Sequence, residues 1–166
     1  MFTAIQWRNS GYVEIAVHGL QQYNPDGQLT DNAIQKRLAL NEMLEHLDGF
    51  KIGRVDYAMD MKKIPPRILK KLSSKRDAKP VGTTTYYQPL KQRERENPTL
   101  KIMTYDKAYK NNLPFSMMRL EFALKSKFWP KEIITSSQVN DLIEAKGATV
   151  IQRWTGERAE VQKLIA

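Results

Sequence analysis

The 166-residue chain contains no cysteine and only two histidines. The lack of cysteine excludes a disulfide framework and every zinc site built on thiolates, and it agrees with a cytoplasmic protein. No run approaches the roughly 18 apolar residues of a membrane span, and we expect neither a membrane segment nor a signal peptide. Glycine-rich phosphate loops are also missing, which disfavours nucleotide hydrolysis. The length predicts one domain over residues 1–166.

The positive charge is concentrated in the middle of the chain. The formal net charge is +9, and residues 60–110 hold 14 Lys or Arg against five Asp or Glu, while the rest holds 13 of each sign. A segregated basic block favours a polyanionic partner, most often nucleic acid, over a merely solvated surface. An acidic membrane fits less well, because the block has no long amphipathic helix with an aromatic face.

Periodicity and turn residues predict an α+β domain with a largely antiparallel sheet. Strand patterns cover residues 12–20, 51–61, 81–87, 100–107, 117–125 and 148–154. Capped helical patterns cover residues 31–48, 64–75 and 136–147, and a final helix is expected from Gly156. The charged stretch 91–99 is typical of a hairpin tip. Gly147 is placed to end the third helix.

Two predicted strands carry a carboxylate on their non-apolar face, Asp56 in "RVDYAMD" and Glu121 in "RLEFALK". A carboxylate in mid-strand is disfavoured by propensity and needs a reason. If the strands are neighbours, the two groups could hold one Mg²⁺ or Mn²⁺. The alternative is that each pairs with a cross-strand Arg or Lys. His18 and Glu14 share a face of an earlier strand and are candidate further ligands.

The stretch "KIMTYDKAYK" contains a candidate nucleophile, Tyr105. A phenol with a pKa near 10 needs assistance to attack phosphorus. On a strand, Lys107 points the same way as Tyr105, and its charge would favour the phenolate. The alternative is that Tyr105 only packs, as most tyrosines in strands do.

Four blocks resemble, in order, those of the Rep_trans-type replication initiators, the rolling-circle initiators of certain plasmids and filamentous phages with related relaxases. "GRVDYAMDM" is similar to the family's Arg-(Ile/Leu/Val)-Asp-x-Ala-x-Asp block, and "TTTYYQ" to its Thr-x-Tyr-hydrophobic strand. "LKIMTYDKAYK" resembles its Arg-Ile-Tyr-(Asp/Asn)-Lys block, and "MRLEFALK" its Arg-(Leu/Val)-Glu strand. The chain departs from the family at "QPLKQREREN", where Gly-Ser-Arg-x-Ser-like residues are usual, and its C-terminal part is short.

The resemblance implies a replication-initiator endonuclease fold, a five-stranded antiparallel sheet with flanking helices. It implies that Tyr105 attacks a DNA phosphate, becomes linked to the 5′ end and frees a 3′-OH primer. Asp56 and Glu121 would bind Mg²⁺ or Mn²⁺, and Lys107 would assist. The partner would be an origin DNA, single-stranded or cruciform, with a host helicase and a second copy of the chain as further candidates.

The basic block supplies the expected DNA contacts. Phosphate contacts and stacking tyrosines are predicted at Lys62, Lys63, Arg67, Lys70, Lys71, Tyr86, Tyr87, Arg93, Arg95 and Arg119. Tyr109 is a further packing or stacking candidate. The competing function is a non-catalytic module of the same fold that binds single-stranded DNA or RNA.

Overall fold

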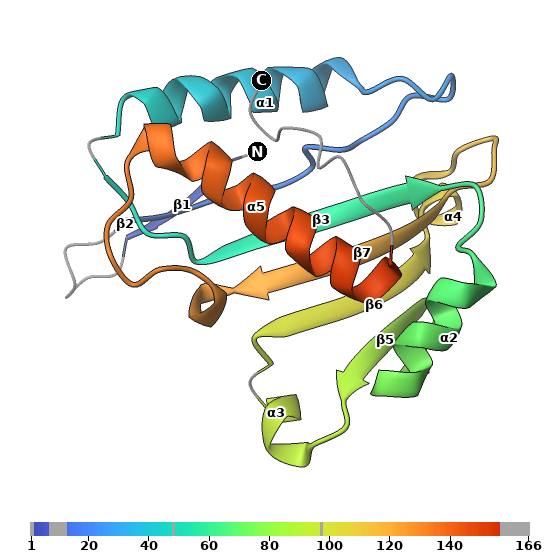
Figure 1. The fold of residues 1–166 in the computed structure, drawn as a ribbon. Helices are drawn as coiled ribbons and strands as arrows, with labels where there is room; N and C mark the ends of the chain where they lie inside the picture. The colour runs from blue at the N-terminus through green and yellow to red at the C-terminus, as the bar shows by residue number, and fades with distance from the viewer. Residues whose placement is uncertain (1, 7–12, 48, 97, 157–166) are drawn as a thin grey trace. The chain divides into compact units, whose positions relative to one another are not determined.

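A computed structural model describes residues 2–6, 13–47, 49–96 and 98–156 (Figure 1). The chain divides into two compact units, one ending at Leu47 and a larger one following it. Within the described ranges, no helix has the length and apolar character needed to cross a membrane.

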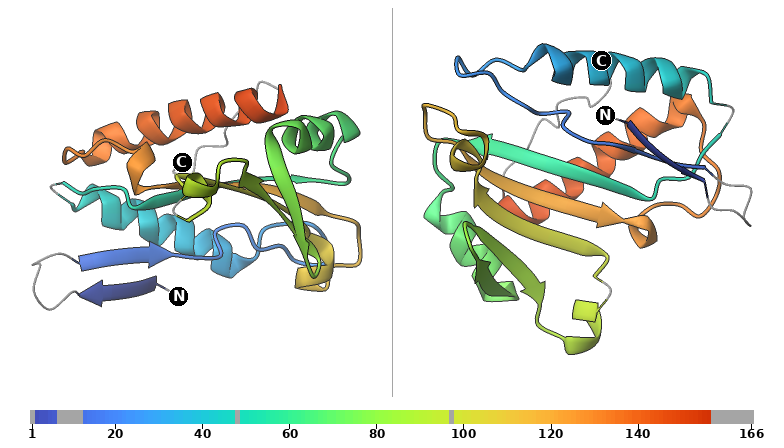
Figure 2. Two further views of the ribbon diagram at one scale, coloured as in Figure 1. Left: turned by 90° about the horizontal axis from the view of Figure 1, so that it is seen from below. Right: turned by 180° about the vertical axis from the view of Figure 1, so that it is seen from behind.

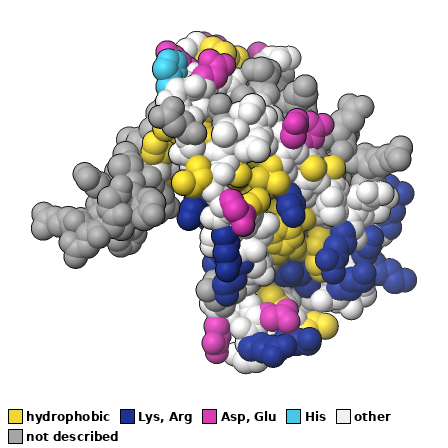
Figure 3. All heavy atoms as spheres, turned by 60° about the vertical axis from the view of Figure 1, so that its left-hand side comes forward, with side chains coloured by type: hydrophobic (Ala, Val, Ile, Leu, Met, Phe, Trp, Pro, Cys, Tyr) yellow, Lys and Arg dark blue, Asp and Glu magenta, His cyan; other side chains and the backbone are white. Residues whose placement is uncertain are grey.

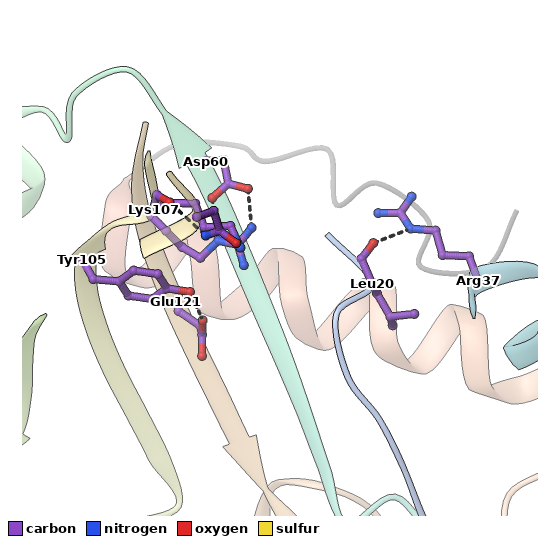
Figure 4. Close-up of polar contacts among 8 residues, drawn as sticks. Leu20, Arg37, Asp60, Tyr105, Lys107 and Glu121 are labelled. Carbon is purple, nitrogen blue, oxygen red and sulfur yellow. Dashed lines mark hydrogen bonds and ion pairs between the residues drawn. The ribbon is translucent and has the colours of Figure 1, made fainter. Parts of the chain in front are cut away.

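The N-terminal unit consists of a two-stranded antiparallel sheet and one helix. Strand β1 (Phe2–Gln6), which the sequence did not predict, pairs with β2 (Val13–Val17). Helix α1 (Asp31–Glu45) begins as predicted, because the Thr30 hydroxyl accepts a hydrogen bond from the Ala33 amide at 3.2 Å. Arg37 Nε donates to the Leu20 carbonyl at 2.9 Å (Figure 4), which ties the helix to the segment after β2.

The larger unit is built on a five-stranded antiparallel sheet, as predicted. Its strands lie in the spatial order β3-β7-β6-β5-β4. Their bounds are β3 (Arg54–Met61), β4 (Arg76–Val81), β5 (Thr84–Pro89), β6 (Leu100–Asp106) and β7 (Met118–Lys125). β7 lies between β3 and β6, so segments that are far apart in the sequence lie side by side in the sheet.

Helices cover one face of this sheet (Figure 2). The two that contribute to the core are α2 (Pro66–Lys75) and α5 (Ser136–Thr155). Pro66 stands at the first position of α2, where its missing N–H costs nothing. Short elements α3 (Gln92–Glu96), α4 (Lys107–Asn111) and η1 (Ser126–Phe128) lie in the connections. The fully buried side chains include Ile68, Leu72, Ile102, Leu120, Phe122 and Leu124.

The strand predicted over residues 148–154 is wrong, because these residues continue α5 to Thr155. Val150, Ile151 and Trp154 are buried at helical spacing against the sheet, so tertiary packing overrides their β propensity. Gly147 therefore lies inside the helix and does not end it. The final helix expected from Gly156 lies outside the described residues.

The single strand predicted over residues 81–87 is also wrong, because a tight turn divides it. Val81 pairs with Thr84 across a two-residue loop, and Gly82 has a φ of +57°. Only glycine adopts that backbone conformation readily, so the chain reverses there into a β4–β5 hairpin. The predicted hairpin tip at 91–99 does join two antiparallel strands, β5 and β6, and carries α3.

Candidate active site

The sheet face opposite the core carries a row of polar side chains on β3, β7 and β6. Strand alternation places Asp60 opposite Arg119 and Arg119 opposite Tyr105 in one row. The next row on the same face contains Glu121, opposite Ala58 and Met103. The strands of Asp56 and Glu121 are therefore neighbours, which is the condition for a shared metal site, and both carboxylates lie on this face.

Tyr105 is held in this row by its hydroxyl group. The hydroxyl donates to Glu121 Oε2 at 3.1 Å, and the side chain is 7% exposed (Figure 4). Lys110 Nζ lies 4.9 Å from the centre of the Tyr105 ring, a cation–π contact. Burial raises the pKa of Tyr105 to about 12, with Arg119 opposing the rise and Glu121 adding to it. The phenol is thus protonated at neutral pH and directs its proton at a carboxylate.

Beside Tyr105 lies a buried ion pair between β7 and β3. Arg119 binds Asp60 through two hydrogen bonds, Nε to Oδ1 at 2.6 Å and Nη2 to Oδ2 at 2.5 Å. Both side chains are at most 10% exposed. Although burial alone lowers the pKa of Arg119, its hydrogen bonds with Asp60 raise it overall. The arginine therefore stays charged and places a fixed positive charge near the Tyr105 oxygen.

Lys107 reaches the same region from a different element than predicted. β6 ends at Asp106, whose side chain accepts from the Tyr109 amide at 2.8 Å and caps α4, so Lys107 is the first residue of that helix. Its side chain is buried. Burial lowers the pKa of Lys107 to about 8; the Arg119 charge adds to the effect and Asp60 opposes it. A lysine with this pKa can exchange a proton near neutral pH.

Asp56 and Glu121 are the carboxylates available to a divalent ion. Asp56 faces Ala123, two residue pairs from Glu121 and therefore in the next row of the same face. The Arg54 guanidinium binds Asp56 at 2.6 and 2.7 Å. That ion pair is largely exposed, so it contributes at most about 1 kcal/mol and is easily displaced. In the part of the chain that the structure describes, no three His, Asp or Glu side chains cluster closely enough to hold a metal. Two carboxylates still fit Mg²⁺, which keeps several of its waters.

The further ligand candidates, His18 and Glu14, belong to the N-terminal unit. His18 is exposed, and the side chain of Glu14 lies outside the described part of the structure. Their proposed approach to the carboxylates of the larger unit stays a prediction.

Most of the predicted DNA-contacting cations lie at the surface. Lys62, Lys63, Arg67, Lys70 and Arg93 are exposed, and Lys71 is half-buried. In the view of Figure 3, Lys and Arg side chains gather toward one side. Arg95 is bound to Asp77 at 3.2 Å and to the Pro89 carbonyl at 2.7 Å, so it also braces the hairpin.

Two predicted DNA contacts are inaccessible. Tyr87 is 5% exposed because its strand phase places it on the core face, opposite Ile102. Arg119 is buried in its pair with Asp60 and faces Tyr105 instead of solvent. Tyr86, the neighbour of Tyr87, has the opposite phase and is exposed.

The pairing of Asp60 with Arg119 was not predicted from the sequence. Strand phase had put both residues on polar faces, but only the pairing of β3 with β7 brings them together. Comparisons with known proteins add nothing to this geometry, since no family model, curated protein or solved structure matches the chain.

Proposed function

We propose that the chain is a rolling-circle replication initiator of the Rep_trans type that cleaves and rejoins single-stranded DNA through Tyr105. The observation that carries this proposal is the hydrogen bond from the Tyr105 hydroxyl to Glu121 on the sheet face that also bears Asp56. A nucleophilic hydroxyl and two carboxylates are thereby held on neighbouring strands. The basic block, with its excess charge, would hold the DNA backbone.

Tyr105, Glu121 and Lys107 supply the groups that the cleavage step needs. The Tyr105 oxygen would form a bond to phosphorus while the bond from phosphorus to the 3′ oxygen breaks. Lys107, whose lowered pKa of about 8 leaves part of it neutral near pH 7, would accept the phenol proton and pass it to the departing 3′ oxygen, so that Glu121 stays ionised. The products are a 5′-phosphotyrosine diester and a free 3′-OH, and reversal of the same transfers rejoins the strand.

Asp56 and Glu121 would hold Mg²⁺ or Mn²⁺. When bound, such an ion neutralises charge on the phosphate oxygens and lowers the pKa of nearby oxygen acids. Arg119 would add a fixed positive charge on the Tyr105 side of the phosphate. Exposed cations on α2, among them Arg67 and Lys70, would contact the backbone of an origin DNA, single-stranded or cruciform.

Covalent trapping on the cognate origin strand tests the proposal. We expect the wild type with Mn²⁺ to form an adduct that survives a denaturing gel, and Tyr105→Phe to reduce it at least about 1,000-fold. Tyr109→Phe is the matched control, because Tyr109 is 74% exposed and lies four residues away. Chelation of the metal should abolish the adduct. An undiminished adduct in Tyr105→Phe would exclude this nucleophile.

The burial of Tyr105 supports a second candidate, a non-catalytic single-strand binding module. A side chain that is 7% exposed, with a pKa of about 12, also suits a purely structural tyrosine. In that case, the protein would bind the origin strand with the same affinity in wild type and Tyr105→Phe, and neither would form an adduct with any divalent metal.

A further inference from the structure

The polar face of the sheet continues beyond Tyr105 toward the β4–β5 hairpin. Tyr86 on β5 lies opposite Met103 on β6, and Met103 lies opposite Glu121 on β7. Tyr86 therefore shares a face and a row with the carboxylate that binds the Tyr105 hydroxyl. Two strand spacings, about 10 Å, separate Tyr86 from Glu121 along this row. Tyr86 is 37% exposed, whereas the neighbouring Tyr87 points into the core.

Uncompensated positive charge surrounds Tyr86. Lys79 on β4 is directly opposite it, and Lys101 is the diagonal neighbour on β6. Both lysines are exposed, and neither forms an ion pair with any residue that the structure describes. Asp77, which lies on the same face of β4 as Lys79, is held by Arg95 at 3.2 Å. An exposed aromatic ring between two available ammonium groups is complementary to a base and its flanking phosphates.

We propose that Tyr86, Lys79 and Lys101 form a platform for single-stranded DNA, on which a base close to the attacked phosphate stacks. This deepens the proposed function, since it takes the DNA strand as its ligand. Tyr105 is the other diagonal neighbour of Tyr86 on β6, about 7–8 Å away, which corresponds to about two nucleotides at the ~3.4 Å rise of a stacked strand. In a duplex, both faces of each base are stacked on the neighbouring bases and cannot contact a tyrosine ring. The platform therefore selects an unpaired strand.

Binding of a fluorescein-labelled thymidine oligonucleotide, followed by anisotropy in EDTA, tests the platform without any cleavage. All variants carry Tyr105→Phe, so that no adduct forms. We expect Tyr86→Ala to weaken binding about 5- to 150-fold, the range that corresponds to losing one stacked base. Tyr86→Phe keeps the ring and should bind within about twofold of the parent. Tyr109→Ala removes a tyrosine that is more exposed than Tyr86 (74% against 37%) from α4, off the sheet face, and should leave the affinity unchanged.

Salt dependence tests the two lysines. Replacing Lys79 or Lys101 by Ala should each lower the slope of log affinity against log salt by about 0.7, the contribution of one phosphate contact to a single strand. Equal binding by Tyr86→Ala and its parent overturns the platform, as does an equal loss in Tyr109→Ala. Tighter binding of duplex DNA or of the matching uridine oligonucleotide overturns its assignment to single-stranded DNA. The platform and the proposed cleavage fail separately. If the affinity depends on Tyr86 but the wild-type protein, which carries Tyr105, forms no adduct, the platform is supported and the proposed cleavage is excluded.

Discussion

Replacing Gly147 by Ala should destabilise this protein, although Gly-to-Ala changes inside helices are usually stabilising. Alanine is favoured over glycine in a helix interior by about 1 kcal/mol. At Gly147, however, a Cβ atom would lie 2.3 Å from Cε1 and 2.7 Å from Cδ1 of Tyr57 on β3. These distances are far below van der Waals contact, so the ring or the helix has to move.

The Tyr57 ring has little freedom to move. It is 4% exposed, and its hydroxyl donates to the Ile143 carbonyl at 2.6 Å one turn earlier in α5. Overpacking of this kind costs about 1–3 kcal/mol, and loss of the buried hydrogen bond adds about 1–3 kcal/mol. After subtraction of the helix propensity of about 1 kcal/mol, we expect a net loss of about 1–5 kcal/mol in the free energy of unfolding.

Thermal and urea unfolding followed by circular dichroism measure this loss. For a chain of this size, about 2 kcal/mol lowers the Tm by roughly 4–8 °C. Gly53→Ala is the control, because a Cβ there meets nothing within 4 Å and the change should be neutral or slightly stabilising. Tyr57→Leu should relieve the clash, so the double variant should show a coupling of about 1 kcal/mol or more. A Gly147→Ala protein as stable as the wild type would refute the close packing of α5 on β3.

Two further predictions concern the buried charges around Tyr105. Asp60→Asn leaves the Arg119 charge buried without its partner and should lower the free energy of unfolding by about 3–5 kcal/mol in urea titrations; a loss below about 1 kcal/mol would contradict the burial of the pair. The pKa of Lys107, about 8 when folded against 10.5, means that the unfolded chain binds more protons between these values. The wild type should therefore gain stability relative to Lys107→Met as the pH rises from 8 to 10, and a constant difference would contradict the lowered pKa.

The polar face of the sheet was predictable because strands have a side-chain period of two. Alternation within residues 54–61 and 118–125 was sufficient to place Asp56 and Glu121 on non-apolar faces. In β5, the same alternation makes Tyr86 exposed and Tyr87 buried. Tyr87 was wrongly predicted as a DNA contact because this alternation was not applied to the two adjacent tyrosines. Lys107 was predicted on the strand but begins α4. The Asp106 side chain caps that helix, and this local signal competes with the strand pattern of the preceding residues.

The order of the strands was not predictable, and the site depends on it. Asp60 and Arg119 are 59 residues apart, and no local propensity relates them. α5 was similarly misread, because the β-branched residues near Val150 become helical only when they pack on the sheet.

By itself, the sequence determined the concentration of positive charge between residues 60 and 110, the alternation of the strands and the helix starts at Thr30 and Pro66. These follow from composition and from contacts within a few residues. Only the tertiary structure decided that β7 lies between β3 and β6, and hence that Tyr105 contacts Glu121 beside the Asp60–Arg119 pair. The physical reason is that antiparallel pairing joins distant segments through backbone hydrogen bonds, which any sequence can make, so the register is set by how the whole apolar face packs.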